Sequence, residues 1–289
     1  MKAPRFKYVR VETVDEALGL LDRHGEGARI LAGGQSLMPT LNMRLSQPEI
    51  LIDINRLQAL KGISEQSGKV RIGALARHVE VMNSPVVAKN LPLIAEAMPH
   101  VAHVAVRNRG TFGGSVALAD PAAEMPACAL ALGATLVVQS SRGRREIAAD
   151  DYFQGLYETA RKADEILVEA LIPIQKPDQV SVFMELTRRH GDFAIAGLAC
   201  CARIKGDTVA DARLVYFGSE VKPTLGKRAM AALKGRKWSD ETRAAVTAAL
   251  ADDLDPMTNL QGSAAMKLHL QRVLTGRAID AAVARARTK

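Results

Sequence analysis

The strongest constraint in the sequence is a pair of double-glycine segments, each of which follows an apolar run and ends in a hydroxyl residue. The first is residues 32–36 and the second is residues 111–115. Adjacent glycines allow positive φ and leave one wall of a turn without Cβ atoms, so successive N–H groups can face an anion. Two such loops predict a site that holds both halves of one pyrophosphate.

Neither segment has the spacing of the common nucleotide-binding loops. The dinucleotide fingerprint G-x-G-x-x-G and the P-loop G-x-x-x-x-G-K-[ST] are both absent from these segments, which argues against a Rossmann or P-loop fold. The alternative for each glycine pair is an ordinary tight turn, because glycine pairs commonly punctuate loops. Two matching segments favour the anion site over that alternative.

A capping box predicts the first helix. Thr13 stands at the N-cap and Glu16 follows three residues later, so that each side chain can bond the other's backbone. This helix should stop near Gly25. Apolar runs elsewhere in the N-terminal part predict strands at residues 28–32, 50–54, 70–74, 134–139 and 166–172.

Two more helices are predicted from a proline at the first helical position. The serine and proline at residues 84–85 open a helix that Pro92 should kink or divide. Asp120 precedes a proline and is expected to cap a helix that ends near Gly133.

The pattern changes after residues 173–177, which are the expected domain boundary. Beyond it, two helices should begin at Ser239 and Ser263, and the second should run towards Gly276. Strands followed by helices are typical of an α+β domain. The strands are expected at residues 182–187, 193–204 and 210–217, with a tight turn between the last two.

Composition limits the class of protein. The 39 basic and 31 acidic residues give a net charge of +8, but the basic residues are scattered and no nucleic-acid-binding motif is visible, so no nucleic-acid partner is expected. Three cysteines without Cys-x-x-Cys spacing argue against disulfides and against zinc or an iron–sulfur cluster in this chain. No apolar run approaches the ~18 residues of a membrane span or forms a signal peptide, so we expect a cytoplasmic protein.

Together these segments resemble the FAD-binding medium subunit of the molybdenum hydroxylases, a group that includes carbon monoxide dehydrogenase, xanthine dehydrogenase and the bacterial nicotine and caffeine dehydrogenases. The resemblance spans roughly residues 5–280, in the expected order. Motifs so long and so ordered are far more specific than one glycine pair. The matching runs are residues 32–37, 107–115, 119–122, 164–167, 172–173 and 188–194.

The resemblance implies an α+β fold of two domains. The FAD-binding domain, residues 1–176, would be of the vanillyl-alcohol-oxidase type, with two α/β subdomains at about 1–57 and 58–176. The C-terminal domain, residues 177–289, would be of the molybdenum hydroxylase flavoprotein type. In that domain a three-stranded antiparallel sheet packs against a helical bundle.

The resemblance also implies that both glycine segments hold the pyrophosphate of a non-covalently bound FAD. Asp120 should cap its helix first and touch the cofactor second, while Glu124 accepts from ribityl or ribose hydroxyls. Arg107 and Arg109 either serve the phosphates or form a solvated, structural pair. The residues expected around FAD are Leu31, Ala32, Gly33, Gly34, Gln35, Ser36, Leu37, Val101, Gly110, Thr111, Gly113, Gly114, Ser115, Leu118, Asp120, Glu124 and Leu167.

Two positions depart from the family pattern. Leu118 stands where many relatives have His or Thr, which removes a polar contact near the flavin. Glu185 lies in a region where many relatives have Lys, and a Glu there looks more like the nicotine and caffeine dehydrogenase branch. His100 and His103 form an H-x-x-H pair without an evident third ligand, so no metal site is expected, and no catalytic residue is assigned.

The implied partners are a large subunit with the molybdenum cofactor and a small subunit with two [2Fe–2S] clusters, as a dimer of heterotrimers. This chain would pass electrons from the clusters through FAD to an external acceptor. One alternative is a free-standing FAD-dependent oxidase or reductase. The other is an assembly or structural subunit that has lost its flavin, against which the intact glycines argue.

Overall fold

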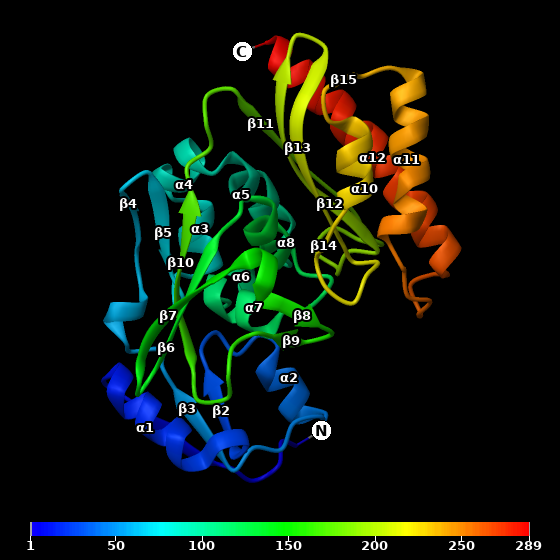
Figure 1. The fold of residues 1–289 in the computed structure, drawn as a ribbon. Helices are drawn as coiled ribbons and strands as arrows, with labels where there is room; N and C mark the ends of the chain where they lie inside the picture. Colours follow the sequence, from blue (N-terminus) through cyan, green and yellow to red (C-terminus); the bar gives the residue numbers. More distant parts are fainter. Residues whose placement is uncertain (1, 289) are drawn as a thin grey trace.

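The computed structural model describes residues 2–288, and the chain begins with a small parallel sheet (Figure 1). Its strands are β1 (Lys7–Arg10), β3 (Ile50–Asp53) and β2 (Ala28–Leu31), paired in that order. Helix α1 (Val14–His24) packs its buried leucines on this sheet. As predicted, Thr13 caps the helix by accepting from the N–H of Glu16, and the helix stops at a glycine with positive φ. The reciprocal bond of the predicted capping box is wrong by one residue, because the side chain of Glu16 accepts from the N–H of Glu12 and not from that of Thr13.

The second sheet has five strands, and every neighbouring pair is antiparallel. Three of its strands were predicted from apolar runs. Its two edge strands, the first and last in the order, were not predicted because they are mostly exposed and polar and contain no apolar run. In sheet order the strands are β4 (Ile63–Gln66), β5 (Lys69–Gly73), β10 (Ile166–Pro173), β6 (Thr135–Ser140) and β7 (Gly143–Ala148).

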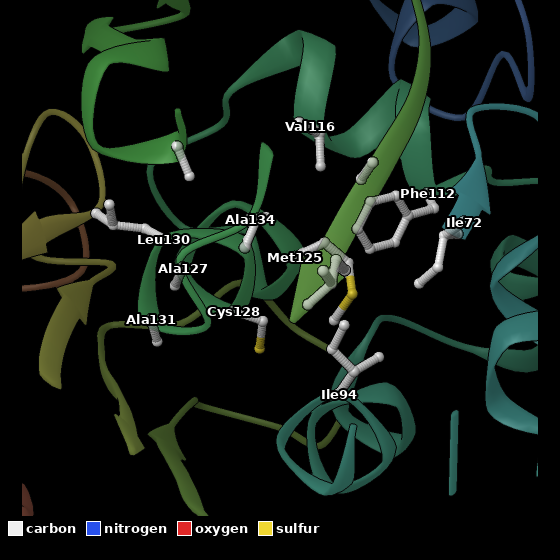
Figure 2. Packing of buried hydrophobic residues seen from close by; sticks show 14 of the residues in the cluster. Ile72, Ile94, Phe112, Val116, Met125, Ala127, Cys128, Leu130, Ala131 and Ala134 are labelled. Carbon is white, nitrogen blue, oxygen red and sulfur yellow. The ribbon is translucent and has the colours of Figure 1, made fainter. Parts of the chain in front are cut away.

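Short helices pack with this sheet around the main hydrophobic core. All eight residues of α8 are buried, and Met125 of that helix lies between Phe112 and Ile94 (Figure 2). Pro92 divides its helix in two, as predicted. The helices of this part are α2 (Leu37–Asn42), α3 (His78–Met82), α4 (Pro85–Asn90), α5 (Pro92–Ala97), α6 (Val104–Arg107), α7 (Phe112–Leu118), α8 (Glu124–Ala131) and α9 (Ala149–Tyr152).

The prediction that Asp120 caps a helix is wrong. Asp120 Oδ1 instead accepts the N–H of Ala122 at 2.9 Å, which closes a turn two residues long. The chain straightens after this turn, and α8 begins at Glu124 with Ala123 as its N-cap. Short elements complete the N-terminal part: η1 (Gly25–Gly27), η2 (Gln58–Leu60), η3 (Met98–His100), β8 (Phe153–Gly155) and β9 (Glu158–Thr159).

The C-terminal part is the expected antiparallel sheet with helices. β11 (Gln179–Leu186), β12 (Ala196–Lys205) and β13 (Thr208–Phe217) pair in sequence order. One face of the sheet packs on α5 and α8, and the other on the C-terminal helices (Figure 1). The remaining elements are β14 (Thr224–Leu225), β15 (Arg236–Lys237), α10 (Lys227–Leu233), α11 (Asp240–Asp253) and α12 (Ala264–Arg287).

The sequence predicts that helix α12 ends near Gly276, and this prediction is wrong. The helix continues to Arg287. The glycine is a packing residue rather than a stop signal, because a Cβ there would lie 2.7 Å from Nη1 of Arg243 in α11. Within residues 2–288, no helix combines the length and the apolar character that a membrane span requires.

Candidate cofactor site

The two glycine segments lie against each other, as the pyrophosphate hypothesis requires. A Cβ on Gly33 would lie 2.4 Å from the carbonyl oxygen of Arg109 and 2.8 Å from Cα of Gly110. Only glycine therefore allows this approach. The guanidinium of Arg77 fixes the contact, because it donates to the Arg109 carbonyl and, at 2.6 Å, to Oδ1 of Asn55.

The first segment leaves a row of backbone donors without protein acceptors. The N–H groups of residues 32–37 donate no hydrogen bond to any residue between 2 and 288. The carbonyls are used instead: Asn55 donates to Ala32 at 2.8 Å, and the N–H of Met38 donates to Gly34 at 3.0 Å. Gly34 has φ +71°, so the turn needs a glycine. Consecutive free N–H groups in such a turn fit the oxygens of a diphosphate.

The second segment forms the first turn of α7 and not an open loop, and its contact with the diphosphate stays a prediction. Thr111 is the N-cap, and its Oγ1 accepts the N–H of Gly114 at 3.0 Å. The N–H groups of Phe112 and Gly113 donate to Ala76 and Ala74, both at 2.9 Å. These three amides are therefore occupied within the protein.

These amides are engaged within the protein because Gly113 packs closely against Ala74. A Cβ there would lie 2.5 Å from Cβ and 2.6 Å from Cα of Ala74, so the missing side chain lets the helix start against the end of β5. What the segment can still offer a ligand is the N–H of Thr111 and the hydroxyl of Ser115, neither of which donates to a described residue.

A cavity of about 600 Å³ opens in front of the first segment, within the range of small-molecule sites. Residues 31–35 line it, as does Arg109, which precedes the second segment. Tyr8, Asp53 and Asn55 line it as well, and sequence reasoning missed them. Asp53 ends β3 and Asn55 follows it. Because β3 pairs in parallel with β2, both strands end at the cavity. Parallel pairing was the signal that could have found them.

The cavity is also lined by a negatively charged group, the carboxylate of Asp53, which is not part of the row of N–H donors. Tyr8 and Asn55 both donate to the carboxylate of Asp53. Burial raises the pKa of this carboxyl, but these hydrogen bonds outweigh burial, and the pKa of Asp53 lies below its ordinary value. An ionised carboxylate at this position can accept hydrogen bonds from sugar hydroxyls.

The other expected residues lie outside this cavity. Ser36 and Ser115 end the two segments, Leu37 follows the first segment, and Gly110 and Thr111 precede α7. Val101 and Leu167 are buried in the main core. The third group lies along α7 and α8: Leu118 ends α7, Asp120 stands in the following turn, and Glu124 begins α8. Arg107 points inward and donates to three carbonyls of residues 99–102, which is the structural role rather than the phosphate role.

Glu124 belongs to a buried cluster at the contact between the two parts of the chain. His100 Nδ1 lies 3.2 Å from Oε1 of Glu185, whose side chain is only 3% exposed and whose Oε2 has no partner among the described residues. Burial raises the pKa of Glu124 to about 8, and repulsion from Glu185 adds to this. The hydrogen bond with Glu185 raises the pKa of His100. No three His, Cys, Asp or Glu side chains within residues 2–288 have a metal-binding arrangement.

We expect this cluster to weaken the fold as the pH rises. The folded chain holds the Glu124 proton up to about pH 8, against an ordinary pKa of 4.5, so its stabilising contribution is complete below pH 4.5 and disappears between these values. The stabilisation that His100 contributes is complete below pH 6.5, its ordinary pKa. It is lost as the pH rises through the higher pKa that His100 has in the folded state. At about 1.4 kcal/mol per pKa unit, the Glu124 loss is on the order of a few kcal/mol.

The measurement is the urea midpoint of the flavin-free chain across this pH range. Between about pH 5 and pH 8 the midpoint should fall more steeply for the natural chain than for Glu124→Gln, which removes the titrating group. Glu241→Gln, at an exposed position on α11, is the matched control and should follow the natural chain. Parallel slopes for all three proteins would show that Glu124 does not hold a proton at neutral pH.

Two family models together match almost the whole chain. The first is described as the FAD binding domain in molybdopterin dehydrogenase and matches residues 4–175. The second is described as the CO dehydrogenase flavoprotein C-terminal domain and matches residues 181–282.

Individual proteins are similar over their full length. The 6-hydroxypseudooxynicotine dehydrogenase complex subunit alpha of Paenarthrobacter nicotinovorans is 37% identical, over 99% of this chain and 97% of that protein. A chain of carbon monoxide dehydrogenase from Hydrogenophaga pseudoflava has a similar structure, with a TM-score of 0.96, 38% identity and 99% of both chains covered. A chain of quinoline 2-oxidoreductase from Pseudomonas putida 86 follows, with a TM-score of 0.93, 37% identity and 99% of both chains covered.

Proposed function

Since the chain belongs to the family of FAD-binding medium subunits of the molybdenum hydroxylases, we propose that it is the electron-transfer subunit of such an enzyme. The redox chemistry is that of the bound flavin, which takes electrons from the [2Fe–2S] clusters of a partner chain and gives them to an external acceptor. The protein's contribution is to bind, orient and tune the cofactor.

The observation that supports this proposal is the row of unpaired N–H groups at residues 32–37. Within this row, Gly33 packs directly against the backbone of Arg109 and Gly110. In the proposed complex these amides donate to the diphosphate, and Arg109 lines the same cavity. The ionised Asp53 accepts from sugar hydroxyls at the same cavity. The binding is non-covalent, because nothing in this site requires a bond to the flavin.

Residues along α7 and α8, together with Val101 and Leu167 of the main core, form the second half of the proposed site. Val101, Leu118 and Leu167 supply apolar contacts, and Glu124 carries a proton at neutral pH. In that protonated form Glu124 can donate a hydrogen bond as well as accept one. No residue acts as a general acid or base on a substrate in this proposal.

The proposed partners are a large subunit with the molybdenum cofactor and a small iron–sulfur subunit, assembled as a dimer of heterotrimers. The name of the Paenarthrobacter relative, subunit alpha of a dehydrogenase complex, supports a heteromeric assembly. Substrate chemistry then takes place on the large subunit, and this chain receives electrons only.

Purification from the native host tests the assembly. We expect this chain to elute with equimolar FAD and molybdenum and with iron at about four atoms per FAD, as two [2Fe–2S] clusters require. The chain expressed alone is the control and should carry neither metal. A flavin-only protein with its own oxidase activity would favour the free-standing enzyme instead, and a colourless protein in a flavin-replete host would favour the structural subunit.

A further inference from the structure

The C-terminal sheet changes character along the face that meets the FAD-binding domain. At one end, the cross-strand row of Phe183, Ala199 and Val215 belongs to the main hydrophobic core. At the other end, the next two rows on the same face are polar. They are Ser181, Cys201 and Arg213, and then Gln179, Arg203 and Asp211.

These polar rows border a cavity of about 240 Å³ between the two parts of the chain. Its other walls are the end of α8 and the connecting residues 173–176, so Lys176 also lines it. The cavity shares no described lining residue with the one at the glycine segments. At roughly 30 Å³ per water molecule it has room for a small hydrated ion, and it is below the usual size of sites for larger ligands.

Two arginines in this cavity have buried donors without acceptors. Nε of Arg203 is fully buried and has no hydrogen-bond partner, and Arg203 forms no ion pair within residues 2–288. Arg213 donates through Nη2 to the carbonyl of Leu130 at 2.8 Å and to Asp150 at 2.7 Å, but its Nε is likewise buried and unpaired. A buried charged donor without an acceptor destabilises the folded chain.

The only carboxylate among the described lining residues does not satisfy these arginines. Asp211 is the cross-strand neighbour of Arg203, but its side chain is 54% exposed and lies 3.9 Å from Nζ of Lys234. With Asp150 counted against its ion-pair partner Arg213, the charged groups at the cavity are Arg203, Arg213 and Lys176 against Asp211 and Asp150, which leaves an excess of one positive charge.

We propose that this cavity binds a small dianionic oxyanion of the phosphate class, held by the guanidinium groups of Arg203 and Arg213. Several oxygens on one ligand can accept from the Nη groups of Arg203 and from Nη1 of Arg213, which donate to no described residue and, unlike the two Nε atoms, are not fully buried. Charge-assisted hydrogen bonds of this kind are strong. The anion contacts β12 and β13 on one side and the connecting residues on the other, so its binding ties the C-terminal sheet to the FAD-binding domain. Ligand binding to the folded state alone raises the unfolding temperature.

The test is titration of the FAD-loaded chain with inorganic phosphate at constant ionic strength, followed by calorimetry and by the unfolding temperature. Loading with FAD prevents phosphate from binding at the glycine segments. We expect one phosphate per chain, bound at least about tenfold more tightly than acetate, since two charges meet the two guanidinium groups. No saturable binding, or equal affinity for acetate, would overturn the proposal.

Three variants locate the site. Arg203→Gln should weaken phosphate binding by about tenfold or more, and Lys176→Gln, which removes an exposed charge, by about two- to threefold. Arg236→Gln, an exposed arginine on β15 outside the cavity, is the matched control and should leave the affinity unchanged. Retained flavin absorbance shows that each variant is folded. Equal loss in the Arg236 and Arg203 variants would mean that phosphate responds to net charge and not to this cavity.

Discussion

Replacing Gly34 by valine is expected to lower FAD affinity by at least about a hundredfold while the chain still folds, because a few kcal/mol of lost hydrogen bonds reach this size. Gly34 has φ +71°, a conformation that a β-branched residue adopts only with strain. A Cβ there would also press on Leu31 at 3.1 Å and Met38 at 3.3 Å. The turn must therefore rearrange, and the N–H groups of residues 33–36 no longer converge. The measurement is the flavin absorbance near ~450 nm per purified chain.

A matched control separates strain from cofactor contact. Gly206 also has positive φ, +58°, but it lies in the exposed hairpin turn between β12 and β13, where an added Cβ would have no neighbour within 4 Å. Gly206→Val should cost a similar amount of stability and keep its flavin. If Gly34→Val retained full flavin content, the first glycine segment would not be the diphosphate site.

Alanine at Gly113 is expected to destabilise the chain by about 3 kcal/mol or more, at the upper end of overpacking costs. The added Cβ would lie 2.5 to 2.6 Å from three atoms of Ala74, two of which are backbone atoms that cannot rotate away. The N–H of Gly113 also donates to the Ala74 carbonyl, so separating the two costs a hydrogen bond. The urea midpoint measures the loss.

The adjacent Gly114 provides the comparison. Its Cβ would meet only Oγ1 of Thr111, at 2.7 Å, and the position is exposed. Weakening the Thr111 cap costs about 1 kcal/mol, and replacing glycine by alanine in a helix gains about as much, so Gly114→Ala should be nearly neutral. Similar midpoints for the two alanine variants would contradict the close packing at Gly113. Because stability is unaffected, any loss of flavin from Gly114→Ala reports on ligand contact.

Local signals in the sequence were sufficient for much of the fold. Thr13, Pro92 and the apolar runs act within a few residues, so capping and periodicity identify their helices and strands. Prediction failed where a distant residue decides the outcome. The sequence predicts a loop glycine at Gly113, whereas in the structure Ala74 occupies the space that a side chain would need. Gly276 predicts the end of a helix, whereas in the structure the helix continues and the side chain of Arg243 covers this glycine.

The residues of the candidate site also fall into two groups, those that a local sequence signal identifies and those that it does not. The glycines of the first segment could be found from sequence because a wall without side chains is a local property. Tyr8, Asp53 and Asn55 carry no local signal of this kind, since only the parallel pairing of β1, β2 and β3 brings them to one cavity. The pairing of His100 with Glu185 was likewise hidden, because it joins residues from the two parts of the chain.

A crystal structure of the chain with FAD bound is the most direct test of the central claim. The diphosphate oxygens should lie about 3 Å from backbone nitrogens of residues 33–36, with Arg109 beside them. Finding the diphosphate elsewhere, with these nitrogens facing water, would contradict the account.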